Sequence, residues 1–126
     1  MSNFKYKIVI SPIGDLRNEP SENSLLETQC LFGEKIKILE LNKNWVFCET
    51  TEDMYKGWMS VDSFGSMPTP THIITNISCL VFKEPSLKSK PLLQLFLGSK
   101  VHMVKNFENG WIKIKINNKS TGFIPK

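Results

Sequence analysis

The side chains that could perform nucleophilic or metal chemistry are three cysteines and two histidines: Cys30, Cys48, Cys79, His72 and His102. A catalytic cysteine needs a base within hydrogen-bonding reach, and neither histidine lies near a cysteine in the sequence. The spacings match no metal-ligand pattern, and there is no glycine-rich phosphate loop. We therefore expect a non-catalytic chain with no metal ion and no cofactor, whose cysteines are small buried hydrophobic residues.

The sequence contains a repeat with a period of 65 residues, and the other candidate site residues belong to it. Each half contains, in the same order, a Glu-Pro pair, a Gln-x-x-x-Gly turn, an apolar strand, a tryptophan and a Gly-aromatic pair. The matched pairs are Pro20 and Pro85, Gly33 and Gly98, and Gly57 and Gly122, each 65 apart, and Trp45 and Trp111, 66 apart. Such a period indicates two copies of one small module.

Alternation of apolar and polar residues predicts that both modules consist of strands. We expect strands at 6–10, 25–31, 35–41, 45–48, 56–59, 72–75, 92–97, 100–104, 111–116 and 121–124, a turn at 13–15, and one helical turn at 60–64. Short strands with frequent turns are typical of small, strongly bent antiparallel barrels. The expected fold class is all-β, with two tandem barrels packed as one unit.

The expected domains are residues 1–66 and 72–126, joined by the proline-containing linker 67–71. Their charges differ: residues 1–69 hold seven basic and ten acidic side chains, net −3, whereas residues 70–126 hold nine and two, net +7. The basic module could face the acidic one or an anionic partner. The sequence shows neither a signal-peptide pattern nor an apolar stretch long enough for a membrane span, so we expect a cytoplasmic chain with no membrane contact.

The same alternation orients the tryptophans. Ile112, Ile114 and Ile116 are expected to face the core of the second barrel, which turns Trp111 outward. In the first barrel, Val46 and Cys48 are expected inside and Trp45 outside. An outward tryptophan needs cover, so Trp45, Trp58 and Trp111 are candidate groove or interface aromatics.

The motifs around these residues resemble those of a known family. The segments Asp15–Ser21, Thr28–Glu34 and Tyr55–Met59, with Trp45 between them, are similar to the first of the paired bacterial SH3 (SH3b) domains that precede the catalytic domain in NlpC-type cysteine peptidases. The segment Phe82–Ser89 is similar to the second. The resemblance covers nearly the whole chain and implies two SH3-like barrels from an enzyme that cleaves γ-D-glutamyl bonds in cell-wall muropeptides.

The resemblance also implies a role for two residues. In this family the first SH3b domain leans over the peptidase groove and helps to select substrates with a free amino end. Glu34 and Tyr55 stand at the matching motif positions, and a carboxylate and a phenol suit an ammonium group. The second module has Ser99 and Ser120 there, so only the first module is expected to contact substrate.

The family's nucleophile motif and downstream histidine are not in this sequence. We therefore expect an accessory unit whose peptidase domain follows it or is separate, and which binds muropeptide weakly when alone. Two alternatives remain open. One is a stand-alone SH3-like adaptor that docks an extended peptide against Trp45, and the other is nucleic-acid binding through the basic second module.

Overall fold

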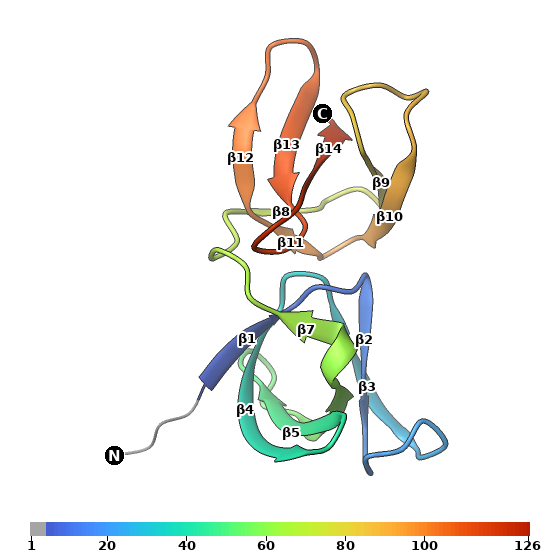
Figure 1. Ribbon diagram of the computed structural model, residues 1–126, viewed down its shortest axis with the longest axis vertical. Coiled ribbons are helices and arrows are strands. Elements are labelled where there is room, and N and C mark those ends of the chain that lie inside the picture. Colours follow the sequence, from blue (N-terminus) through green and yellow to red (C-terminus); the bar gives the residue numbers. More distant parts are fainter. Residues whose placement is uncertain (1–4) are drawn as a thin grey trace. The chain divides into compact units, whose positions relative to one another are not determined.

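The computed structural model describes residues 5–126 and divides the chain into two compact units, with the boundary between Gly65 and Ser66. The expected all-β class is confirmed, because every element is an antiparallel strand except one 3-10 turn (Figure 1). Among the described residues, no helix is long and apolar enough to cross a membrane.

The first unit is one curved sheet with the strand order β3-β2-β6-β5-β4-β1-β7. Its elements are β1 (Lys5–Val9), β2 (Ile13–Arg17), β3 (Leu26–Leu31), β4 (Lys35–Asn42), β5 (Trp45–Thr50), β6 (Lys56–Ser60), η1 (Val61–Ser63) and β7 (Phe64–Gly65). The predicted helical turn is confirmed by η1, where the Ser60 hydroxyl accepts a hydrogen bond from the Asp62 amide at 3.3 Å.

The second unit contains a five-stranded sheet in the order β10-β9-β14-β13-β12 and a small β11-β8 pair. Its elements are β8 (His72–Ile73), β9 (Ser78–Phe82), β10 (Pro91–Phe96), β11 (Lys100–Val101), β12 (Met103–Asn106), β13 (Trp111–Lys115) and β14 (Thr121–Pro125). The strand predicted at 100–104 is thus split in two, and β9 was not predicted.

The two units repeat one core. Six pairs of buried positions match between the copies, five of them 65 residues apart and Cys48 and Ile114 66 apart. The other five pairs are Val9 and Ile74, Leu16 and Val81, Cys30 and Leu95, Ile36 and Val101, and Met59 and Ile124. The two glycines of the repeated turn, Gly33 and Gly98, have φ angles of 89° and 94°, a left-handed conformation that favours glycine. The repeat therefore encodes the same turn and the same interior twice.

One prediction of local structure was wrong, and one was confirmed in part. Residues 13–15 form part of β2 and not a turn. Gly14 serves close packing there, because a β-carbon on it would lie 3.2 Å from Val9 Cγ1. In β13, only Ile114 is fully buried, whereas Ile112 and Ile116 remain partly exposed. The curvature of a small barrel leaves room for few side chains at its centre, so positions near the strand ends reach solvent.

Candidate functional site

The two residues expected to contact substrate, Glu34 and Tyr55, lie in turns at the same end of the first unit. The backbone amide of Thr51 and its hydroxyl both donate to the carbonyl of Lys35, at 3.3 and 3.1 Å. This contact ties the β5–β6 turn to the residue that follows Glu34. The structure therefore places the two turns against each other, as a joint binding site requires.

The turn that carries Tyr55 is firmly held. The Tyr55 amide donates to the Thr50 hydroxyl at 3.0 Å, and its carbonyl accepts from the Thr50 amide at 2.9 Å. Met54 has a φ of 60°, and its amide donates to the Thr50 carbonyl at 3.0 Å. These bonds fix the backbone, while the Tyr55 side chain is half exposed, at 51%. Its phenol can therefore meet a ligand.

Glu34 is partly buried next to the core thiol of Cys30. Burial raises the pKa of Cys30 well above its ordinary value, and the negative charge of Glu34 raises it further. Asp53, in the neighbouring turn, adds further negative charge near this thiol. A carboxylate has two oxygens and can accept several hydrogen bonds. Glu34 thus keeps capacity for an ammonium group, in a region where Asp53 reinforces the negative potential.

The second unit has a different arrangement at the matching positions. Ser99 is fully buried, and its hydroxyl accepts from the amide of Phe96 at 3.2 Å. Ser120 uses its carbonyl to accept from the Ile116 amide at 2.9 Å, which repeats the Thr50–Tyr55 bond without the phenol. Because the carboxylate and the aromatic side chain are both missing, this end of the second unit offers nothing comparable for a cation.

Trp45 lies at the opposite end of the β5–β6 hairpin and lines a separate groove. Its strand partner is Ser60, whereas Glu49 and Lys56 pair at the other end near Tyr55. Trp45 and Glu49 are four positions apart on β5, which corresponds to about 13 Å at 3.3 Å per residue. Trp45 contributes to three adjoining hollows of the first unit, of 520, 330 and 480 Å³. Trp45 therefore borders hollows that a ligand could enter, and its role as a groove residue stays a prediction.

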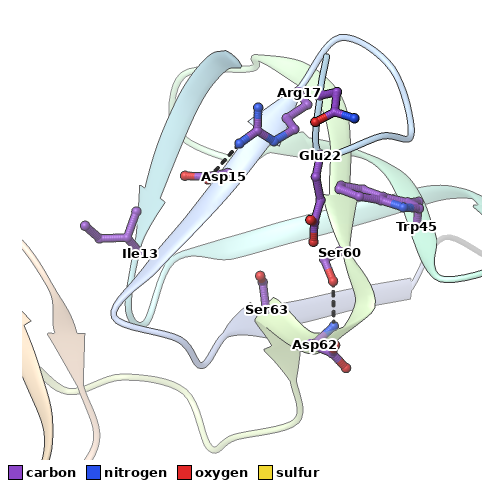
Figure 2. A pocket seen from close by; sticks show the side chains of 9 residues that line it. Ile13, Asp15, Arg17, Glu22, Trp45, Ser60, Asp62 and Ser63 are labelled. Carbon is purple, nitrogen blue, oxygen red and sulfur yellow. Dashed lines mark hydrogen bonds and ion pairs between the residues drawn. The ribbon is translucent and has the colours of Figure 1, made fainter. Parts of the chain in front are cut away.

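The walls of this groove are mostly polar, with the acidic residues Asp15, Glu22 and Asp62 and the basic residues Arg17 and Lys43. Figure 2 shows Arg17, Glu22 and Trp45 gathered in one part of it, with Asp62 and Ser63 in another. Arg17 is tied down by bonds to Asp15 at 3.3 Å and to the Ser24 carbonyl at 2.8 Å. Its charge is thereby offset by that of Asp15. Glu22 and Asp62 supply the net negative charge of the hollow that they share with Trp45.

The loop that forms one wall is closed by side-chain hydrogen bonds, and the same bonds recur in the second unit. Ser24 donates its hydroxyl to the carbonyls of Glu19 and Ser21, at 2.9 and 2.6 Å. Ser89 makes the same bonds to Glu84 and Ser86, at 3.0 and 2.8 Å. The Glu-Pro motif of the repeat is therefore a folded loop, and only in the first unit does it border this groove.

The other two tryptophans pack on aromatic neighbours. The ring centroids of Trp58 and Phe47 are 5.3 Å apart. Those of Trp111 and Phe82 are 5.8 Å apart, and these two rings are nearly perpendicular to each other. Phe82 occupies the position that Arg17 occupies in the first unit, 65 residues earlier. The phenyl ring thus covers Trp111, whereas Trp45 borders open space. Sequence reasoning did not single out Arg17, Glu22 or Asp62, although the Arg17–Phe82 difference was visible in the repeat.

Within residues 5–126, no group of three or more histidine, cysteine or acidic side chains could hold a metal ion. The candidate sites of the described chain are the Glu34–Tyr55 end and the Trp45 groove.

Together these features define a class of protein, namely a pair of small antiparallel β units of the SH3-like kind. Both candidate binding surfaces lie on the first unit. Residues 16–64 match the family model described as the bacterial dipeptidyl-peptidase Sh3 domain. The expected resemblance of the first unit to a bacterial SH3 domain is thereby confirmed. No curated protein matches the chain.

Solved structures extend the likeness in fold to both units. The chain superposes on an NlpC/P60 family protein from Bacillus cereus with a TM-score of 0.78 and 15% identity, over 97% of this chain and 54% of that protein. It thus spans about half the length of that relative. NlpC2 and NlpC1 from Trichomonas vaginalis match with TM-scores of 0.45, at 15% and 16% identity, over 100% and 99% of this chain and 47% and 45% of theirs.

Proposed function

We propose that this chain is a non-catalytic binding module that positions a muropeptide for an NlpC-type cysteine peptidase domain, joined to it or separate. In this proposal the first unit recognises the free amino end of the peptide through Glu34 and Tyr55. The match of residues 16–64 to a peptidase-associated SH3 family supports the class of partner. The observation that carries the proposal is the meeting of an acidic turn and a tyrosine turn at one end of that unit.

The chemistry of the site suits a primary ammonium group. Glu34 and Asp53 supply negative charge, and the Tyr55 oxygen can accept a hydrogen bond from the ammonium. An acetylated amine has no charge and one donor, so it loses the ion pair. The site would therefore favour a peptide with a free amino terminus, and the second unit would serve as a scaffold because serines replace both residues.

The test is the affinity of the chain for L-Ala-γ-D-Glu, measured by isothermal titration calorimetry, with the N-acetylated dipeptide as the matched ligand. Glu34→Gln is expected to weaken binding of the free dipeptide by at least about tenfold, because a charge-assisted hydrogen bond contributes roughly 1.5–3 kcal/mol. Tyr55→Phe is expected to weaken it about fivefold, because an ordinary hydrogen bond contributes about 1 kcal/mol. Glu27→Gln removes an equal charge from β3 and is the control. Equal binding of the acetylated dipeptide, or equal losses in Glu27→Gln and Glu34→Gln, would reject the proposal.

A second candidate function is an adaptor that binds an extended peptide in the Trp45 groove. The observation that favours it is the open, acidic hollow beside a partly buried tryptophan. A tryptophan face with nearby carboxylates suits a lysine or arginine side chain. Retention of basic peptides by the chain, lost in Trp45→Ala and kept in Tyr55→Phe, would support this candidate and separate it from the muropeptide site. Retention unchanged by Trp45→Ala would exclude it.

A further inference from the structure

The outer face of β12, β13 and β14 carries two lysines in an arrangement that costs stability unless an anion is bound. Lys105 on β12 and Lys113 on β13 are direct cross-strand partners. Like charges at such positions repel and destabilise the sheet. Among residues 5–126, neither lysine forms an ion pair. The second unit has only two acidic residues, Glu84 and Glu108, against nine basic ones.

Two phenylalanines support these ammonium groups. Lys105 Nζ lies 4.9 Å from the centroid of the Phe107 ring, and Lys113 Nζ lies 5.8 Å from that of Phe123. The two rings are themselves 6.1 Å apart. The four side chains therefore form one cluster, which we call the lysine–phenylalanine cluster. It holds two positive charges on the outer face of strands that Figure 1 shows side by side.

The same face of the first unit carries the opposite charge. The cross-strand pair that matches Lys105 and Lys113 is Glu40 and Phe47, and the residue that matches Lys115 is Glu49. Trp58 stands where Phe123 stands in the second unit. This face thus presents carboxylates in one copy and ammonium groups in the other, at matched positions of the paired strands β4–β5 and β12–β13. The charge reversal at these matched positions is part of the difference in net charge between the two halves, and it indicates a difference in what this face meets.

The geometry indicates recognition of phosphate charge and not of bases. A nucleic-acid base needs an open aromatic face for stacking. Here each phenyl ring has a lysine ammonium over it, and the two rings pack on each other. Lys113 and Lys115 alternate along β13, on the side opposite the buried Ile114, and are about 7 Å apart at 3.3 Å per residue. Successive charges of a phosphodiester chain can meet such a row.

We propose that the lysine–phenylalanine cluster, extended by Lys115, binds a base-free phosphodiester polymer of the poly(polyol phosphate) kind. The polymer would lie along β13, and its phosphates would relieve the repulsion between Lys105 and Lys113. This surface is separate from the Glu34–Tyr55 end and from the Trp45 groove, so it does not depend on the function proposed for the first unit.

The test uses a fluorescein-labelled abasic oligonucleotide, a chain of phosphodiesters without bases, and measures its binding by fluorescence anisotropy over a range of salt concentrations. Each contact between a lysine and a phosphate of a single strand contributes about −0.7 to the slope of the logarithm of the binding constant against the logarithm of the salt concentration. At 0.1 M salt, one such contact therefore raises the affinity about fivefold. Lys105→Gln/Lys113→Gln is therefore expected to weaken binding about 25-fold and to reduce the slope by about 1.4. Lys88→Gln/Lys119→Gln removes the same charge from loops of the same unit and is the control.

Several results would overturn the proposal. Equal weakening by the two double variants would mean that net charge, and not this face, determines binding. Tighter binding of oligo(dT) than of the abasic chain would mean that bases stack on the protein, as in nucleic-acid recognition. The melting temperature of Lys105→Gln/Lys113→Gln should equal or exceed that of the wild type, because the repulsion is removed, and a clear fall would refute the repulsion itself.

Discussion

Replacing Gly57 with alanine should destabilise the first unit, because strands β2 and β6 approach too closely there for a side chain. A β-carbon on Gly57 would lie 2.8 Å from the backbone oxygen of Arg17 and 2.8 Å from Leu16 Cγ. Arg17 is the residue of β2 that pairs with Trp58 on β6. Since one of the crowded atoms belongs to the backbone, the strand and not only a side chain must move.

The size of the effect follows from two opposing contributions. Overpacking by a methyl group in a filled interior costs about 1–3 kcal/mol. Alanine also restricts the unfolded chain, which returns about 0.4–1 kcal/mol. The net loss for Gly57→Ala is therefore about 1–2 kcal/mol, which lowers the melting temperature of a unit of this size by about 4–8 °C per kcal/mol.

The assay is urea unfolding followed by tryptophan fluorescence. Lys56→Ala is the matched control, because Lys56 is the exposed neighbour on the same strand and surface substitutions change stability by less than about 0.5 kcal/mol. Gly122→Ala should destabilise the second unit in the same way, since its β-carbon would lie 2.5 Å from Val81 Cγ1. If Gly57→Ala were as stable as Lys56→Ala, close approach would not explain why this glycine recurs in the repeat.

Two further predictions concern the core. Burial raises the pKa of Cys48 to about 12 and that of Cys30 further. Above pH 9 the thiols of the unfolded chain therefore ionise while those of the folded chain stay protonated, and the free energy of unfolding should fall by up to about 1.4 kcal/mol per pH unit per thiol. Urea unfolding at pH 8–10.5 should show a shallower fall of this free energy in Cys30→Ala/Cys48→Ala than in the wild type, and an equal fall would contradict the raised thiol pKa values. Phe82→Ala should lower the free energy of unfolding by about 3–5 kcal/mol, because Phe82 is 7% exposed and packs on Trp111. Leu87→Ala is the control and should change thermal stability little, because Leu87 is 73% exposed. Equal losses of stability in the two variants would argue against Phe82 as the cover of Trp111.

The sequence predicted those features that local chemistry determines. Alternation along β5 correctly placed Val46 and Cys48 inside, since a strand turns successive side chains to opposite faces. The glycine of the repeated turn was recognisable because its left-handed backbone recurs at Gly33 and Gly98. Both features depend on residues that are close together in the chain.

The features that the sequence did not predict correctly depend on contacts between segments far apart in the chain. Gly14 suggested a turn, but it lies in a strand and makes room for Val9. The groove beside Trp45 combines Arg17 from β2, Glu22 from a loop and Asp62 from η1, and no spacing in the sequence brings these together. One signal of the groove is present in the repeat, because Arg17 and Phe82 differ at the matched position that decides whether a tryptophan is covered.

The central claim is that the first unit alone recognises a free amino terminus, and its most direct test is a nuclear magnetic resonance titration of the nitrogen-labelled chain with L-Ala-γ-D-Glu. Amide shifts should concentrate at residues 30–35 and 50–56, and should be absent with the N-acetylated dipeptide. Shifts of equal size around Ser99 and Ser120 in the second unit, or the same shifts with the acetylated ligand, would contradict the account.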